Sequence, residues 1–272
     1  MIESPKVPVS VIIPCYCCAD TVDRAFSSIV TQSMLPMEVI FVDDCSKDEN
    51  ATQKKLHSIQ DRYAHLLNIV ILKAEVNDGP GSSRNLGWNL ATQPYIAFLD
   101  ADDSWHPRKL AIQFEWMQLH SDVSLSGHLS LQLEVGAPPP DLGVLSATQL
   151  SFEQLLITNS LPTRSVMLKR SIQERFYPGK RQAEDYLLWL QIAFTGAPIY
   201  RINLPMAFSY KEDFGASGLN ANLSDSITGV LDTYRKLLDA GQLSFWRHIL
   251  YKNIAILKHI RRKVLVSLRN YS

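Results

Sequence analysis

The sequence lacks long apolar runs and a surplus of either charge, and each absence excludes a class of protein. No segment reaches the roughly 18 uninterrupted apolar residues that a membrane-spanning helix needs. The N-terminus lacks the basic start and apolar stretch of a secretory signal, so we expect the protein to stay on the cytoplasmic side. The 27 basic and 27 acidic residues balance, which argues against a nucleic-acid binder that depends on a basic surface.

Cysteines are few, and their spacing does not predict a metal centre. The four are Cys15, Cys17, Cys18 and Cys45, three of them in one short loop. Structural zinc sites normally take two separated pairs of ligands, so reduced thiols are the better interpretation. The rest of the composition, 46% apolar and 20% charged, is that of an ordinary globular protein, and 272 residues can bury one sizeable core. Function must therefore be inferred from motifs.

Short β-branched runs alternate with helical patterns along the first hundred residues. The predicted strands are residues 9–13, 38–42, 68–72 and 95–99. The predicted helices between them lie near residues 20–30, 50–63 and 81–91. This alternation predicts an α/β fold, with a mostly parallel sheet flanked by helices, whose ligands bind beyond the carboxyl ends of the strands. The residues that the pattern brings to that edge are Pro14, Asp43, Asp44, Asp100 and Asp102.

Two carboxylates, Asp100 and Asp102, stand one residue apart after an apolar strand. Such a turn can offer oxygens to a hard divalent cation that also binds a diphosphate, although a turn acid more often only solvates a strand end. The surroundings favour the metal site, because residues 42–46 (VDDCS) form a second acidic turn. Residues 77–85 (NDGPGSSRN) add a glycine loop before a helix. With Arg84 that helix N-terminus suits a diphosphate, or the loop is a plain turn with a surface arginine.

Four segments, in the same order, resemble the family-2 glycosyltransferases of the GT-A fold. They are residues 9–16 (VSVIIPCY), 42–46 (VDDCS), 84–85 (RN) with 98–103 (FLDADD), and 184–189 (EDYLLW). The resemblance implies a Rossmann-like GT-A sheet. It also implies an inverting, metal-dependent transfer of one sugar from a nucleotide-diphosphate sugar, with a UDP-sugar favoured by family frequency. The setting that it implies is the assembly of a bacterial cell-surface polysaccharide.

The resemblance also implies where the nucleotide lies. Pro14, Tyr16 and Asp44 would line the nucleoside pocket, with Asp44 accepting hydrogen bonds from the base. Arg84 would lie near the diphosphate. The chain departs from the family at Cys17, where members commonly have asparagine, so the hydrogen bond of that side chain is not expected here.

The metal and the catalytic base follow from the same resemblance. Asp100 would lie near the ribose or the metal, and Asp102 would bind a divalent ion, Mn²⁺ or Mg²⁺, with Asp103 able to share the task. Asp185 would be the general base that deprotonates the acceptor hydroxyl, with Glu184 orienting the site. The alternative for this pair is helix capping, since acids suit the first turn of the helix predicted at residues 183–194.

Residues 1–220 are predicted to form the catalytic domain, and residues 221–272 to form C-terminal helices. Within the domain, residues 163–169 resemble one more strand. Residues 210–218 resemble the family's loop that often folds over the donor, to which Gly215 and Gly218 give hinge freedom; alternatively, flexibility alone explains these glycines. No acidic residue follows Asp239. The basic residues beyond it are Arg247, Lys252, Lys258, Arg261, Arg262, Lys263 and Arg269.

The apolar residues of the last helix share one arc, which has two interpretations. They are Ile249, Ile256, Leu257, Ile260, Val264 and Leu268. The arc could lie on an anionic membrane surface, which would suit a saccharide acceptor linked to a polyprenyl diphosphate. Alternatively, the arc packs on the catalytic domain, and the charges are a solvated face.

Two other functions remain open at this point. The chain could be a non-catalytic module that binds nucleotide sugars within a synthase complex. It could also be a sugar nucleotidyltransferase, which would release pyrophosphate rather than a nucleoside diphosphate. The Gln-X-X-Arg-Trp signature of processive synthases is absent, so one sugar per acceptor is expected.

Overall fold

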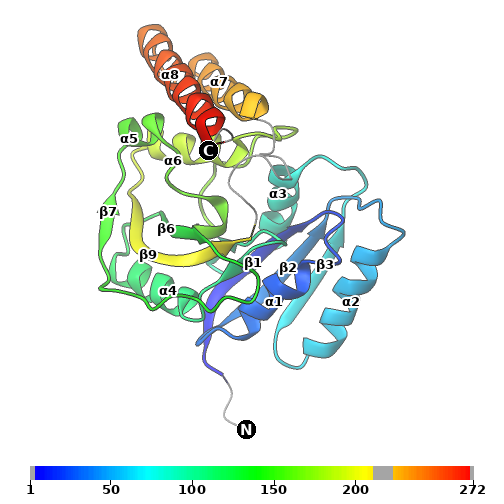
Figure 1. Ribbon diagram of the computed structural model, residues 1–272. Coiled ribbons are helices and arrows are strands. Elements are labelled where there is room, and N and C mark those ends of the chain that lie inside the picture. Colours follow the sequence, from blue (N-terminus) through cyan, green and yellow to red (C-terminus); the bar gives the residue numbers. More distant parts are fainter. Residues whose placement is uncertain (1–3, 211–222, 270–272) are drawn as a thin grey trace.

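A computed structural model describes residues 4–210 and 223–269, with side chains described as far as residue 263 and, after the gap, from residue 225. The described part of the chain forms a nine-stranded sheet with helices on both faces (Figure 1). The strands are β1 (Lys6–Cys15), β2 (Leu35–Asp43), β3 (Asn68–Lys73), β4 (Tyr95–Phe98), β5 (Ser104–Trp105), β6 (Leu125–Gln132), β7 (Ala147–Gln149), β8 (Met167–Lys169) and β9 (Ile199–Ser209). The helices are α1 (Val22–Val30), α2 (Ala51–Tyr63), α3 (Pro80–Leu90), α4 (Lys109–Leu119), α5 (Phe152–Ile157), the 3₁₀ turn η1 (Thr163–Ser165), α6 (Glu184–Phe194), α7 (Leu223–Asp239) and α8 (Phe245–Arg269).

The sheet has a parallel half and a mixed half. Its order is β3-β2-β1-β4-β8-β6-β9-β5, and β7 pairs with β9. Strands β3, β2, β1 and β4 pair in parallel, as the alternating pattern predicts, because a crossover helix joins each strand to the next. Antiparallel pairs enter with β8, which pairs with both β4 and β6. The α/β fold is therefore confirmed, and the four strands within the first hundred residues of the chain pair in parallel.

The segment predicted as one strand over residues 163–169 is divided. Its first part is the 3₁₀ turn η1, and only Met167–Lys169 forms strand β8. The backbone N–H and the hydroxyl of Ser165 both donate to the carbonyl of Pro162, at 2.8 and 2.7 Å, and they close the chain into a tight turn. Sequence periodicity does not report such a turn, because the apolar run of Val166, Met167 and Leu168 that follows it is the same in either case.

The core consists of two apolar layers, one on each face of the sheet. Along β1, Val11 and Ile13 face one layer, which is covered by α1, α2 and α4, whereas Ile12 faces the other. The second layer contains Trp88 of α3 and the apolar residues of α5 to α8 (Figure 1). Residues 9–13 of β1 and 38–42 of β2 are buried on both faces, which explains why apolar residues there do not alternate with polar ones; the two polar exceptions, Ser10 and Glu38, are hydrogen-bonded to each other.

Helix α3 lies unusually close to the sheet. A Cβ atom on Gly87 would be 2.6 Å from Cγ2 of Ile12 and 3.3 Å from Cγ2 of Val42, so only glycine fits at this contact. The close approach holds the first turn of α3, including Arg84, near the carboxyl ends of β1 and β2.

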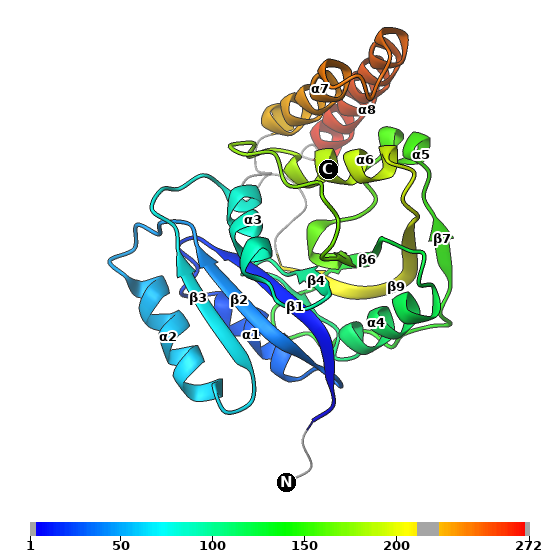
Figure 2. The same ribbon diagram turned by 180° about the vertical axis from the view of Figure 1, so that it is seen from behind.

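The C-terminal helices α7 and α8 lie side by side and pack on α5 and α6, at the side of the molecule away from β3 (Figures 1 and 2). Tyr234 of α7 is buried there, and its hydroxyl donates to the carbonyl of Leu156 at 2.7 Å. In α8, Tyr251 and Ala255 are buried against this cluster. No helix within the described residues is long and apolar enough to cross a membrane.

The arc of α8 that packs on the protein differs from the predicted apolar arc. Leu257 and Ile260, which belong to the predicted arc, are 66% and 52% exposed. Arg247 and Lys258 instead face α5, where they bond to Glu153 and to the carbonyl of Ile157. Val264 and Leu268, at the end of the predicted arc, lie outside the described side chains.

Candidate active site

The ends of β1, β2 and β4 meet at one edge of the sheet. Pro14 is in register with Val42, and the backbone N–H of Asp44 donates to the carbonyl of Cys15 at 2.8 Å. On the other side of β1, the N–H of Leu99 donates to the carbonyl of Ile12 at 3.1 Å. The chain segments that carry Tyr16, Asp44 and Asp100 therefore leave the sheet beside one another, as the motif order predicts.

Asp44 is buried and fixes the glycine loop. Its two carboxylate oxygens accept the backbone N–H groups of Asp78 and Gly79, at 3.1 and 2.9 Å. Asn77 donates its side-chain amide to the carbonyl of Asp44 at 2.9 Å. Gly79 has a φ of 89°, which requires glycine, and Pro80 then begins α3. Each oxygen of Asp44 keeps a second lone pair, so the predicted hydrogen bond to a nucleobase stays a prediction.

Beside Asp44, the edge offers an open aromatic ring. The side chain of Tyr16 is 50% exposed, and Pro14 is partly buried beneath the same edge. Cys17 has a φ of 47° and donates its N–H to the hydroxyl of Ser46 at 2.9 Å. This left-handed conformation is one that asparagine adopts readily, which gives a backbone reason for the family's asparagine at the position of Cys17.

Arg84 is buried between two carboxylates. Its two terminal nitrogens donate to Asp100 at 2.6 Å and to Glu184 at 2.9 Å. Burial alone would lower the pKa of Arg84, but the charges of Asp100 and Glu184 outweigh it and raise that pKa. The guanidinium thus joins the end of β4 to the start of α6. Its predicted contact with a diphosphate is not visible in this arrangement and stays a prediction.

The three acids after β4 occupy different environments. Asp100 and Asp102 are partly exposed, whereas Asp103 is buried and lies 3.3 Å from Arg164. Burial raises the pKa of Asp103 to about 8, and Arg164 opposes that rise. The backbone carbonyl of Asp102 accepts a hydrogen bond from Arg24 at 2.6 Å, which holds the turn in place. Asp103 is therefore a poorer candidate metal ligand than Asp100 and Asp102.

The donor set at this turn suits a hard divalent ion. Among the described residues no group of three His, Cys, Asp or Glu side chains could hold a metal by itself. A site with one or two carboxylates fits an ion that takes its remaining ligands from a bound diphosphate and water. The partly exposed Asp102 and Asp100 are the residues that would hold it.

Glu184 and Asp185 begin α6, but they do not have the same surroundings. Glu184 is buried, and burial raises its pKa to about 7, with the Asp185 charge acting in the same direction and Arg84 opposing it. Asp185 is partly exposed, and its Oδ2 accepts hydrogen bonds from Thr163 at 2.9 Å and Asn159 at 3.3 Å. Its Oδ1 accepts the N–H of Tyr186 at 2.6 Å. The contact at Oδ1 resembles capping. Oδ2, in contrast, is held by side chains that lie outside the helix.

Trp189, one turn further along α6, belongs to the core. It is fully buried, and its indole N–H donates to the carbonyl of Leu161 at 3.0 Å. The predicted donor loop with Gly215 and Gly218 lies outside the described residues.

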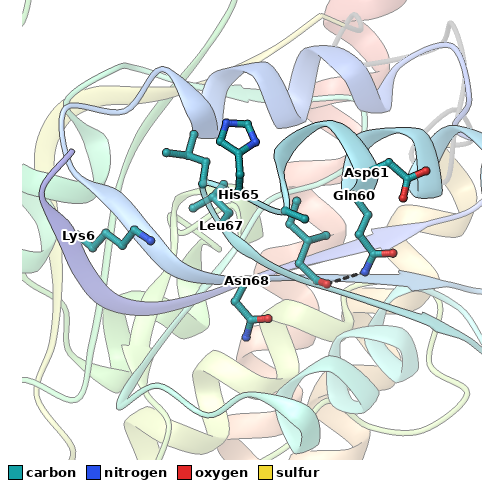
Figure 3. A pocket seen from close by; sticks show the side chains of 9 residues that line it. Lys6, Gln60, Asp61, His65, Leu67 and Asn68 are labelled. Carbon is teal, nitrogen blue, oxygen red and sulfur yellow. Dashed lines mark hydrogen bonds between the residues drawn. The ribbon is translucent and has the colours of Figure 1, made fainter. Parts of the chain in front are cut away.

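The surface pocket in Figure 3 lies away from these residues. Lys6 and Asn68, which line it, are the first residues of β1 and β3, so the pocket is at the amino edge of the parallel strands. Gln60 closes one wall and donates to the carbonyl of Ile69 at 2.7 Å (Figure 3). No residue of the pocket belongs to the carboxyl-edge site, and we assign it no part in the reaction.

The fold and the carboxyl-edge acids together define an α/β protein with a candidate ligand site at the ends of its parallel strands, and comparisons identify the family. The model of glycosyl transferase family 2 matches residues 10–175. The chain belongs to glycosyl transferase family 2 and is a glycosyltransferase. This membership also separates it from the sugar nucleotidyltransferases.

The named relatives are bacterial glycosyltransferases. TuaG of Bacillus subtilis, provisionally named a teichuronic acid biosynthesis glycosyltransferase, is 30% identical over 73% of this chain and 77% of its own length. WfaP of Escherichia coli, named a UDP-Glc:α-D-GlcNAc-diphosphoundecaprenol β-1,3-glucosyltransferase, is 27% identical over 72% of this chain and 74% of its own. TarS 1–349 of S. aureus, solved with UDP-GlcNAc, superposes with a TM-score of 0.65 at 19% identity, over 85% of this chain and 66% of that chain. The last likeness confirms the GT-A fold.

Three residues of the site were not found by sequence reasoning. Asn159, Thr163 and Arg164 contact Asp185 or Asp103, but they lie in a segment without a recognisable motif. Their role depends on contacts between residues more than 20 positions apart, which no local spacing reports.

Proposed function

We propose that this glycosyltransferase moves a single sugar, with inversion, from a UDP-sugar to a hydroxyl of a lipid-linked saccharide during assembly of a cell-surface polysaccharide. One observation carries the proposal: Arg84 bridges Asp100 and Glu184. The turn suited to a diphosphate-bound metal and the start of α6 with Asp185 are thereby held at one edge of the sheet. An inverting transfer needs this pairing of a leaving-group site and a single base.

The reaction is a single displacement. Asp185 takes the proton of the acceptor hydroxyl, whose oxygen forms a bond to the anomeric carbon on the face opposite the diphosphate. The bond from that carbon to the diphosphate oxygen breaks, and its electron pair leaves with the nucleoside diphosphate. Asp102 and Asp100 would hold a Mn²⁺ or Mg²⁺ ion, which stabilises the charge on the leaving diphosphate when it is bound. Glu184 orients the site through Arg84.

The relatives support the substrate classes. The TarS structure contains UDP-GlcNAc, and the name of WfaP combines a UDP-glucose donor with a diphosphoundecaprenol-linked acceptor. In this chain, Tyr16 offers an exposed ring to a uracil base, and Asp44 offers acceptor oxygens beside it. Both features fit a pyrimidine nucleotide.

A donor panel tests this function. We expect purified protein with Mn²⁺ to release nucleoside diphosphate from one UDP-sugar among UDP-glucose, UDP-galactose and UDP-GlcNAc. Release should be faster when a short-chain lipid carrying α-GlcNAc-diphosphate is added as acceptor. A preference for GDP-sugars would overturn the assignment of a pyrimidine base, because the Tyr16 and Asp44 contacts would then have to read a purine. A preference for dTDP-sugars would overturn the assignment of uracil, because the pocket would then take the added methyl group of thymine.

We further propose that the helices within residues 221–272 hold the enzyme on an anionic membrane surface. Trp246, Leu250, Leu257 and Ile260 recur at helical spacing on α8 and are all more than half exposed. Exposed basic side chains flank them at Lys252, Arg261, Arg262 and Lys263. An apolar stripe beside cations suits a lipid surface, where each Lys or Arg contributes about 1 kcal/mol. Contact between two copies through this stripe would instead bring like charges together.

Vesicle binding tests the membrane contact with a matched pair of variants. We expect the full chain to pellet with phosphatidylglycerol vesicles, and Leu257→Asp to weaken that binding about tenfold, because it places a charge in the apolar stripe. Leu119→Asp is the control, since Leu119 is 82% exposed on α4, outside the stripe. Equal pelleting of the two variants, or no pelleting by the full chain, would contradict the proposal.

A further inference from the structure

A tight turn between α5 and β8 contacts two acids of the site. Thr163 of η1 donates its hydroxyl to Oδ2 of Asp185 at 2.9 Å. The next residue, Arg164, lies 3.3 Å from Oδ2 of Asp103. Adjacent residues of one turn therefore reach the start of α6 and the turn that follows β4.

The main chain of this turn is anchored from three sides. The indole N–H of Trp189 donates to the carbonyl of Leu161 at 3.0 Å, and that of Trp105 donates to the carbonyl of Arg164 at 2.7 Å. The side-chain amide of Gln113 donates to the carbonyl of Ser165 at 3.0 Å. All three donors belong to buried side chains on different elements. The turn is thus a fixed base from which Thr163 and Arg164 project.

We infer that Thr163 is a positioning residue that sets the direction of the Asp185 carboxylate, and this inference rests on the proposed function. The carboxylate is held at both oxygens, by the N–H of Tyr186 at Oδ1 and by Thr163 and Asn159 at Oδ2. Asn159 is exposed, so water competes for its hydrogen bond, whereas Thr163 is buried and its hydroxyl is shielded. The Thr163 contact therefore fixes the carboxylate more firmly.

Positioning matters because a base must lie within hydrogen-bond reach of the hydroxyl that it deprotonates. A carboxylate that rotates away from the acceptor loses rate even when its chemistry is intact. Arg164 adds a second function to the turn, since it fixes the Asp103 end of the loop that carries Asp102. The turn consequently sets the separation between the base and the metal-binding acids.

Two substitutions separate positioning from packing. Thr163→Val keeps the shape of the side chain and removes its hydroxyl, whereas Thr163→Ser keeps the hydroxyl and removes the methyl group. A hydrogen bond to a charged group is strong enough that its loss is expected to lower kcat about tenfold or more. The KM for the donor should not change, because Thr163 contacts the base rather than the nucleotide. Thr163→Ser should retain kcat within about twofold, since it keeps the donor hydroxyl.

The experiment measures kcat and KM with UDP-glucose and the short-chain α-GlcNAc-diphosphate lipid for wild type, Thr163→Val, Thr163→Ser and Asp185→Asn. Thermal unfolding of each variant reports whether it is folded. A low kcat in Thr163→Val with recovery in Thr163→Ser supports the inference. The inference is overturned if Thr163→Val has the kcat of wild type, or if both Thr163 variants lose kcat equally. In either case Asp185→Asn should remain inactive, because the proposed function would still hold. A fully active Asp185→Asn variant would instead overturn the proposed function itself.

Discussion

Asp185→Asn is expected to lower kcat by about 10² to 10⁴-fold, the range that a general base contributes. The amide has the shape of the carboxylate, and when its oxygen accepts the N–H of Tyr186 its nitrogen can donate to the hydroxyl of Thr163, but it cannot take up the acceptor proton. Donor affinity should be unchanged, because the base faces the acceptor. Steady-state rates and a titration with UDP measure the two quantities separately.

Asp61→Asn is the matched control, because Asp61 is exposed on α2 and lines only the pocket at the amino edge. If Asp185 only stabilised the first turn of α6, the exchange would instead lower the free energy of unfolding by about 0.3 to 1 kcal/mol, through the lost charge, and leave kcat unchanged. A kcat within tenfold of wild type in Asp185→Asn would therefore favour capping over catalysis.

Arg84→Met is expected to lower the free energy of unfolding by about 3 to 5 kcal/mol, the loss seen when one partner of a buried ion pair is removed. Arg84 is 3% exposed and serves both Asp100 and Glu184. Without it, at least one buried carboxylate has no compensating charge. Urea unfolding, with the slope checked for each variant, measures the loss.

The pH dependence of this loss gives a second test. In the folded protein the pKa of Glu184 is raised to about 7 even though Arg84 lowers it. Without Arg84, folded Glu184 should therefore hold a proton at pH values where the unfolded chain, with the ordinary pKa of 4.5, has released it. Stability of Arg84→Met should therefore increase as the pH falls from 8 to 6. Arg62→Met, at an exposed arginine of α2, is the control. Unfolding of Arg84→Met like wild type at both pH values would contradict the bridging role.

Local patterns were sufficient for half of the fold and for placing the candidate site residues of its first hundred positions at one edge of the sheet. The mostly apolar runs of β1, β2 and β4 are followed by Pro14, Asp43 and Asp100, so the type of these strands and their ligand edge follow from the sequence. The second half was harder to predict because β8 pairs antiparallel with both β4 and β6 and contains only three residues. Such a short strand has too few residues to display a period.

The connections between site residues could not be read from the sequence. Arg84 and Glu184 are 100 positions apart, and Thr163 and Asp185 are 22 apart. Their meeting depends on how α3, η1 and α6 pack, not on any spacing within one element. The same limit applies to α8, where Leu257 and Ile260 of the predicted apolar arc are exposed and the surface that packs is set by α5 and α7.

The central claim is most directly tested by nucleoside-diphosphate release from the preferred UDP-sugar, with acceptor and Mn²⁺, in wild type and Asp102→Ala. We expect release by wild type, and its loss in Asp102→Ala or after removal of the metal with a chelator, because the leaving diphosphate then lacks its compensating charge. Donor binding by wild type without any release would contradict the account and identify a non-catalytic nucleotide-sugar-binding module. Equal release by Asp102→Ala would contradict the role given to that carboxylate.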